Sequence, residues 1–182
     1  MKRAIVLFTI SLIALTIGFT IASVTNIVRL PYKTYYSFMT VDAKKQVECL
    51  AENMYFEAGY EPEKGQIAVA FVTINRVKSG FFEDDICGVV KQKFKGVCQF
   101  TWYCEHENPT ANRLTGRSKE VYNDIRSLAV YVYSNYDRLE DPSKGALFYH
   151  ADYVKPGWKN MEYLTTIGRH LFYNRKDMKW IS

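Results

Sequence analysis

The sequence predicts a mostly helical α+β domain preceded by one N-terminal transmembrane helix. A long uncharged apolar stretch lies near the N-terminus, and apolar residues recur at helical spacing in three later segments. Two short apolar or aromatic segments near the C-terminus are bounded by turn residues and are typical of strands. We therefore divide the chain into a membrane anchor, residues 1–28, a juxtamembrane linker, residues 29–42, and a domain, residues 43–182.

The N-terminal stretch, residues 4–28, carries no charge and follows Lys2 and Arg3. As a helix it would rise about 37 Å at ~1.5 Å per residue, enough to cross a hydrocarbon core of ~30 Å. A cleavable signal peptide is the alternative, but its apolar core is usually only ~7–15 residues long and it ends at a small-residue cleavage site. Because basic flanks stay inside, we expect a cytoplasmic N-terminus and a domain in the periplasm or otherwise outside the cytoplasmic membrane.

Helical segments of the domain are recognised by their apolar stripes and by their end signals. The first is expected over residues 43–58, after an N-cap at Asp42 and before Gly59. The second begins near Pro62 and ends at Ser79-Gly80. Two further helices are expected, a short one after Asp84-Asp85 that ends between residues 90 and 93, and a long one over residues 118–133.

The remaining segments are extended or irregular. Residues 96–107 combine two cysteines with three aromatic side chains and predict a cross-linked loop or short sheet. Residues 141–145, DPSKG, have the composition of a turn. Residues 146–150 and 167–173 are the two expected strands, separated by the turn at Pro156-Gly157.

Four cysteines, Cys49, Cys87, Cys98 and Cys104, all lie in the part of the chain that the anchor would export. An even number of cysteines in that setting predicts disulfides, although three connectivities are possible. We expect Cys87–Cys98, which would close a short loop and contribute roughly 3 kcal/mol, and then Cys49–Cys104. Four reduced core thiols are the alternative.

The net charge of +5 is mild and spread along the chain. It suits an anionic envelope polymer or lipid surface, and it gives no basic and aromatic patch of the kind that nucleic-acid binders use. The three histidines and four cysteines show no tight metal-ligand spacing. We therefore expect no nucleic acid partner, no metal and no cofactor. We also expect a monomer.

Glu57 is the residue on which a functional prediction depends. It lies three residues after Met54 and seven after Leu50, so its carboxyl is aimed at the apolar side of the first domain helix. Burial raises the pKa of a carboxyl, and a carboxylic acid that keeps its proton near neutral pH can act as a general acid. The alternative is a glutamate at a frayed helix end, neutralised by Lys64 or Arg76.

A series of short motifs gives the chain a family resemblance from about Val47 to Tyr173. They are Cys49-Leu50-Ala51, Tyr55-Phe56-Glu57-Ala58, Glu61-Pro62, residues 65–70, Asn75-Arg76-Val77, residues 86–90, residues 98–102, Asp141-Pro142 with Gly145-Ala146, residues 148–151, residues 154–158, Ile167-Gly168, His170 and Phe172-Tyr173. In this order they resemble the SleB-like cell-wall hydrolase family. The resemblance implies a fold like that of lysozyme and lytic transglycosylases, and cleavage of the glycan strands of peptidoglycan.

The resemblance also implies which residues form the site. The catalytic acid of the family matches Glu57. The substrate cleft would be lined by the segment Gln99, Phe100 and Thr101 and by the pair Tyr149 and His150. The chain departs from the family pattern at two places that could alter glycan binding. Gly59-Tyr60 stands where the family often has arginine, and Thr101 replaces a commoner serine. Four aromatic residues are candidates for stacking on sugars: Tyr60, Trp102, Tyr149 and Trp158.

A single marked carboxyl favours lytic transglycosylation next to N-acetylmuramic acid, in which the substrate closes on itself to a 1,6-anhydro end. A hydrolysing muramidase would need a second carboxylate. The available ones are Glu61, Asp84, Asp85, Glu105 and Asp152. A membrane-tethered module that binds peptidoglycan without cutting it, and a cysteine-histidine peptidase, are further alternatives. The expected partners are therefore peptidoglycan strands and, through the N-terminal helix, the membrane.

Overall fold

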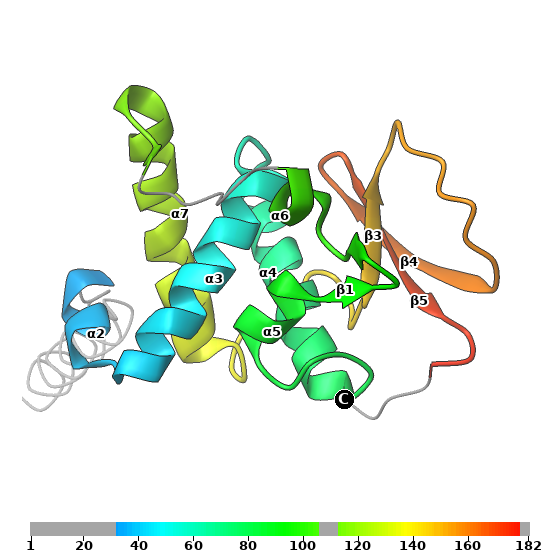
Figure 1. The fold of residues 1–182 in the computed structure, drawn as a ribbon, viewed down its shortest axis with the longest axis horizontal. Helices are drawn as coiled ribbons and strands as arrows, with labels where there is room; N and C mark the ends of the chain where they lie inside the picture. Colours follow the sequence, from blue (N-terminus) through cyan, green and yellow to red (C-terminus); the bar gives the residue numbers. More distant parts are fainter. Residues whose placement is uncertain (1–31, 106–112, 179–182) are drawn as a thin grey trace, which may run out of the picture. The chain divides into compact units, whose positions relative to one another are not determined.

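The computed structural model describes residues 32–105 and 113–178 and shows helices beside a small sheet (Figure 1). The predicted membrane anchor lies outside these residues. Within 32–105 and 113–178, no helix is long and apolar enough to cross a membrane. The elements are α2 (Tyr32–Phe38), α3 (Val41–Ala58), α4 (Glu63–Ser79), α5 (Ile86–Lys91), β1 (Lys93–Phe94), β2 (Val97–Cys98), α6 (Thr101–Glu105), α7 (Gly116–Asn135), β3 (Phe148–Ala151), β4 (Met161–Ile167) and β5 (His170–Arg175).

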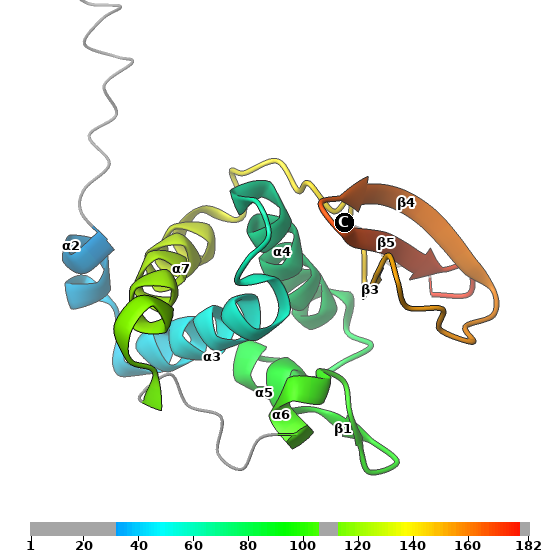
Figure 2. The ribbon, with the colours of Figure 1, turned by 90° about the horizontal axis from the view of Figure 1, so that it is seen from above.

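Helix α3 is the centre of the domain, with α4, α5 and α7 packed against it (Figure 2). Its side chains Val47, Leu50 and Met54 are fully buried and belong to the main hydrophobic core. The predicted helix is confirmed, but it begins two residues earlier. Thr40 is the N-cap instead of Asp42, because the Thr40 hydroxyl accepts a hydrogen bond from the backbone N–H of residue 43 at 3.1 Å.

Within residues 29–42, the predicted juxtamembrane linker, the structure has the helix α2. The helix is held by the carboxylate of Glu48 on α3. That carboxylate accepts hydrogen bonds from Tyr36 of α2 at 2.8 Å, from Tyr122 of α7 at 3.1 Å and from Arg126 Nε at 2.7 Å. One partly buried acid therefore fixes two neighbouring helices, which no local pattern in the sequence indicates.

All four cysteines form disulfides, as predicted, but the predicted pairing is wrong. Cys49 of α3 pairs with Cys87 of α5, and Cys98 of β2 pairs with Cys104 of α6. The first bridge follows from the packing of α5 on α3, where Gln46 also accepts a hydrogen bond from the Cys87 N–H at 3.0 Å. Loop length alone could not select the partners, because pairing depends on which elements meet in the fold.

The sheet has three antiparallel strands in the order β3-β5-β4. The strand expected over residues 146–150 corresponds to β3. The one expected over 167–173 corresponds in part to β5, but a turn at Gly168, with φ of 55°, leaves Ile167 at the end of β4 and begins β5 at His170. The inner face of the sheet, with Phe172 fully buried, packs on Ala68 and Val72 of α4.

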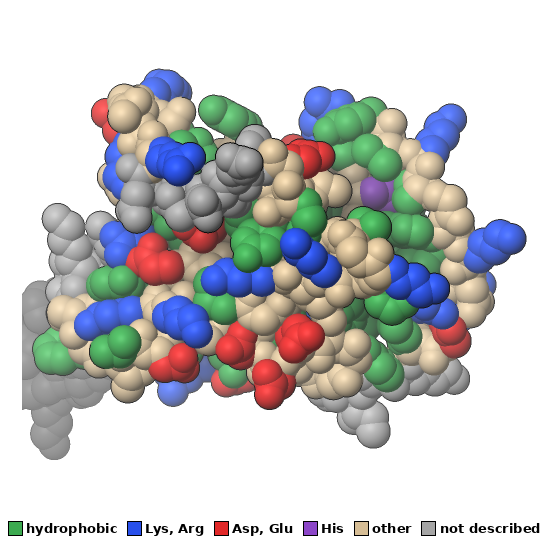
Figure 3. Space-filling model, viewed as in Figure 1, with side chains coloured by type: hydrophobic (Ala, Val, Ile, Leu, Met, Phe, Trp, Pro, Cys, Tyr) green, Lys and Arg blue, Asp and Glu red, His purple; other side chains and the backbone are tan. Residues whose placement is uncertain are grey.

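The turn predicted at residues 141–145 is confirmed, and it places β3 beside α4. Asp141 accepts hydrogen bonds from the N–H of Ser143 and Gly145, each at 2.7 Å. It also accepts one from the side chain of Asn75 on α4 at 2.9 Å. On the face in Figure 3, lysine and arginine side chains are interspersed with acidic and hydrophobic ones and form no continuous basic surface.

Candidate active site

A cleft of about 480 Å³ lies where the end of α3, helix α6 and strand β3 meet. The sequence named six residues for the site, and all six line this cleft although they come from three separate segments. The lining residues are Phe56, Glu57, Arg76, Gln99, Phe100, Thr101, Trp102, Glu105, Tyr149, His150, Ala151, Tyr153, Val154 and His170.

Glu57 occupies the last turn of α3 and is partly buried. Burial raises the pKa of its carboxyl, and the charge of Glu105 raises it further. Two groups act in the opposite direction: the Tyr149 hydroxyl, which donates a hydrogen bond to Glu57 Oε2 at 3.0 Å, and the positive charge of Arg76. The pKa is raised overall, as the sequence predicted. No ion pair among the described residues includes Glu57.

Arg76 of α4 is buried beside this carboxyl and has no ion-pair partner among the described residues. Its Nε donates to the Leu147 carbonyl at 2.8 Å, while its Nη1 is buried and has no hydrogen-bond partner among the residues that the structure describes. The guanidinium lies over three phenylalanine rings, at 4.9, 5.0 and 5.8 Å from the centroids of Phe100, Phe82 and Phe148. Burial lowers the pKa of Arg76, and the fields of Tyr149 and Glu57 raise it. Arg76 therefore supplies a fixed positive charge to the cleft.

Tyr149 is held by aromatic packing on the inner face of the sheet. Its ring centroid lies 5.2 Å from His170 in an edge-to-face arrangement and 5.7 Å from Phe172. Burial and the charge of Glu57 raise the pKa of Tyr149 well above its ordinary value, so the hydroxyl stays protonated and donates to Glu57. Burial also lowers the pKa of His170, whose Nδ1 is buried and has no hydrogen-bond partner in the described part of the chain.

The opposite wall is built by β2 and α6. Trp102 donates from Nε1 to the buried Asn53 of α3 at 3.0 Å, and its ring stacks on Phe56 at 4.5 Å. These two contacts hold α6 on α3. They therefore fix the position of the neighbouring residues Gln99 and Thr101, which line the cleft. Phe100 is buried beneath them. The Phe100 ring packs on the guanidinium of Arg76 and so helps to hold that side chain in the cleft.

Of the carboxylates considered as a second catalytic group, Glu105 alone lines this cleft. Glu61 accepts a hydrogen bond from the Arg169 N–H at 3.0 Å, and Asp152 pairs with the Arg169 guanidinium at 3.1 Å. Asp84 and Asp85 line a separate pocket, and Asp85 caps α5.

The other chemistries find no matching arrangement in the described part of the chain. No group of three or more histidine, cysteine or acidic side chains there is placed to hold a metal ion. All four cysteines are in disulfides, so none is a free nucleophile. His150 lines the cleft with its ring stacked on Tyr173 at 5.2 Å, and its Nδ1 lies 2.9 Å from the Ala151 carbonyl oxygen.

Sequence comparison places the chain among cell-wall enzymes. A family model described as Cell Wall Hydrolase matches residues 60–173, beginning three residues after Glu57. The spore cortex-lytic enzyme of Halalkalibacterium halodurans is 32% identical over 132 residues, which are 70% of this chain and 34% of that protein. The enzyme of the same name from Oceanobacillus iheyensis is 28% identical over 134 residues, 71% of this chain and 42% of that protein. The chain thus spans less than half the length of these relatives.

Two solved structures share the fold. One is the catalytic domain of the germination-specific lytic transglycosylase SleB from Bacillus anthracis, with a TM-score of 0.54 and 27% identity over 72% of this chain and 95% of that one. The other is the catalytic domain of the Bacillus cereus SleB protein, with a TM-score of 0.55 and 28% identity over 72% and 91%. These findings confirm the resemblance read from the motifs, and the chain belongs to the SleB-like cell wall hydrolase family.

Proposed function

We propose that this chain cuts the glycan strands of peptidoglycan next to N-acetylmuramic acid by lytic transglycosylation, with Glu57 as the single acid and base. The observation that carries the proposal is the setting of Glu57. Its carboxyl lies in a cleft, its pKa is raised by burial, and one hydroxyl donor orients it. A relative with this fold is described as a lytic transglycosylase, which supports the same reaction here.

In the first step, the protonated Glu57 gives its proton to the oxygen that bridges N-acetylmuramic acid and the next sugar. The bond from C1 to that oxygen breaks, and the 2-acetamido group of the substrate supports the positive charge that develops at C1. Glu57 is left as a carboxylate. The Tyr149 hydrogen bond and the Arg76 charge both favour that form, so the groups that lower the pKa stabilise the product of the proton transfer.

In the second step, the Glu57 carboxylate takes the proton of the C6 hydroxyl as that oxygen forms a bond with C1. The product is a 1,6-anhydro ring, the proton is back on Glu57, and no water is consumed. The raised pKa suits both steps, because the same group must give and take one proton near neutral pH. Gln99, Thr101 and His150 line the cleft around the sugar and are proposed to orient it.

Hydrolysis is the competing reaction, and one observation favours testing it. Glu105 lines the same cleft and its charge acts on Glu57. A second carboxylate at a suitable distance activates a water molecule in glycosidases, and the product is then a reducing end.

The test is mass spectrometry of the fragments released from purified peptidoglycan. For the wild type we expect 1,6-anhydro ends. Glu57→Gln keeps the shape and removes the proton, so we expect a loss of about 10²–10⁴-fold in rate. Glu105→Gln serves as the matched variant and should keep both the rate and the anhydro product. Reducing ends from the wild type, together with inactivity of Glu105→Gln, would instead assign hydrolysis.

We also propose that residues 4–28 anchor the enzyme in the membrane with the domain outside the cytoplasm. The two disulfides support an oxidising location, because such bonds are rare in the cytosol. Cell fractionation with a C-terminal tag tests the anchor. A full-length protein in the membrane fraction is expected, whereas a shortened protein released from the membrane would indicate a cleaved signal peptide.

A further inference from the structure

A second hollow, of about 330 Å³, adjoins the cleft at the end of α3. Its lining comes from one continuous segment, residues 55–61. Phe56 and Glu57 line both this hollow and the main cleft. The proposed acid therefore stands at the boundary between two spaces, each at the lower end of the ~300–1,000 Å³ typical of small-molecule sites.

The hollow has a fixed shape because its turn is fastened at several points. The N–H of Gly59 donates to the Tyr55 carbonyl at 3.0 Å, and a Cβ at residue 59 would lie only 2.5 Å from that oxygen. The Glu61 carboxylate accepts a hydrogen bond from the N–H of Arg169 between β4 and β5. It also lies so close to Gly168 that a Cβ there would collide with it. The turn is thus pinned to the sheet, and the site is preformed.

Tyr60 is the side chain that this turn offers to solvent. It is 86% exposed, the highest value among the four aromatic residues that the sequence suggested for sugar stacking; Trp158 is 43% exposed and Trp102 only 5%. An exposed aromatic ring beside a hollow of mixed polar and apolar lining suits a sugar ring, which presents C–H groups on its faces and hydroxyls at its edge.

We infer that this hollow is a second sugar subsite, with Tyr60 as its stacking surface, and that it holds the leaving N-acetylglucosamine unit. The inference rests on the proposed function. An acid that protonates a bridging oxygen must have a sugar on each side of that oxygen, and Glu57 lines two adjoining hollows that could each take one. The ring that forms the anhydro product occupies the main cleft beside Tyr149, and the sugar across the broken bond lies over the Tyr60 turn.

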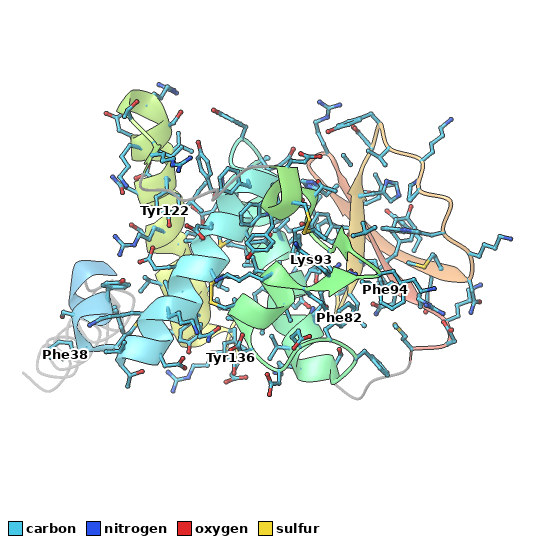
Figure 4. The ribbon with its side chains drawn as sticks, viewed as in Figure 1. Phe38, Phe82, Lys93, Phe94, Tyr122 and Tyr136 are labelled. Carbon is cyan, nitrogen blue, oxygen red and sulfur yellow. A yellow bond between two sulfur atoms is a disulfide. The ribbon has the colours of Figure 1, made fainter. Side chains whose placement is uncertain are left out.

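The test compares Tyr60→Ala and Tyr60→Trp with the control Phe38→Ala. Phe38 is 85% exposed and lies on α2, at the end of the domain away from the sheet (Figure 4). On peptide-free glycan strands, Tyr60→Ala should raise KM by about three- to tenfold, the size expected for one aromatic contact, with the anhydro product unchanged. Tyr60→Trp retains an aromatic face and should therefore recover most of the affinity that Tyr60→Ala loses, and Phe38→Ala, outside the site, should keep the wild-type KM.

A binding measurement separates failure of the subsite from failure of the proposed reaction. Oligomers of N-acetylglucosamine are titrated into Glu57→Gln protein with and without Tyr60→Ala, where no cleavage takes place. Weaker binding by about the same factor in the double variant supports the subsite even if the wild type proves to hydrolyse its substrate. Equal affinity of the two proteins, absence of binding, or an unchanged KM of Tyr60→Ala would overturn it.

Discussion

The hydrogen bond from Tyr149 to Glu57 makes a quantitative prediction about the pH dependence of the enzyme. Tyr149→Phe removes a single donor at 3.0 Å and leaves a ring that still packs on His170 and Phe172. A hydrogen bond to a charged group contributes about 1.5–3 kcal/mol, and one pKa unit corresponds to about 1.4 kcal/mol. Water in the open cleft replaces part of the lost hydrogen bond, so we use the lower end of this energy range. The carboxylate form of Glu57 should lose about 1.5 kcal/mol of stabilisation, so the pKa of Glu57 should rise.

The direction of the pKa change depends on whether the Tyr149 donor favours the ionised or the protonated form of Glu57. The Tyr149 hydroxyl stabilises the carboxylate, so without it Glu57 holds its proton to higher pH. The alkaline limb of kcat/KM against pH reports the acid of the free enzyme and should therefore move to higher pH in Tyr149→Phe. Near neutral pH the rate should fall, because the carboxylate formed in the first step is less stable.

The matched control is Tyr163→Phe. The hydroxyls of Tyr163 and Thr166 on strand β4 form a hydrogen bond of 2.8 Å. Tyr163 is exposed and lies outside the cleft. Loss of the Tyr163 hydroxyl should leave the pH profile unchanged. An alkaline limb that stays in place in Tyr149→Phe, or moves to lower pH, would refute the assignment of Glu57 as the acid oriented by Tyr149.

Two further predictions concern the charge beside Glu57 and the disulfides. Arg76→Met should also move the alkaline limb of kcat/KM to higher pH, because a positive charge that favours the Glu57 carboxylate is lost. Arg76→Lys keeps a positive charge and should move the limb less. Identical pH profiles for the two variants would contradict this reasoning. Replacing both Cys49 and Cys87 by alanine should lower the free energy of unfolding by about 4 kcal/mol, because this bridge spans 38 residues. Replacing both Cys98 and Cys104 should lower it by only about 2 kcal/mol, because that bridge spans 6 residues. Urea unfolding of the two double variants measures the difference, and a larger loss for the second pair would contradict the loop-closure reasoning.

The helices were predictable where a local pattern decides them. Helix α3 shows its stripe through Val47, Leu50 and Met54, and each of these side chains is fully buried. Helix α2 was not predictable, because its position depends on a hydrogen bond from Tyr36 to Glu48 in another helix. The division between β4 and β5 was missed for a similar reason. Residues 167–173 have strand composition throughout, and only the left-handed conformation of Gly168 separates the strands.

The candidate site was predictable as a set of residues but not as an electrostatic arrangement. Helical spacing placed Glu57 toward the core, and the motifs supplied Gln99 and Tyr149. The sequence indicates Arg76 only as a charge that neutralises the acid, since an arginine in a helix is normally solvated or ion-paired. Its guanidinium lies over three phenylalanine rings, and two of them, Phe100 and Phe148, come from distant parts of the chain. Only a structure brings those together.

Helix α3 explains how one carboxylate can be placed to within hydrogen-bonding distance of a tyrosine on the sheet. Successive polar or sulfur-bearing side chains along it each hold a different neighbour: Glu48 holds α2 and α7, Cys49 holds α5, and Asn53 holds α6 through Trp102. Glu57 is the next in this series and meets Tyr149. Because α6 and β3, which both line the cleft, are bonded to the helix that carries the acid, displacement of either one alters the surroundings of Glu57. The proton donor and its cleft therefore form one unit, built on a single helix.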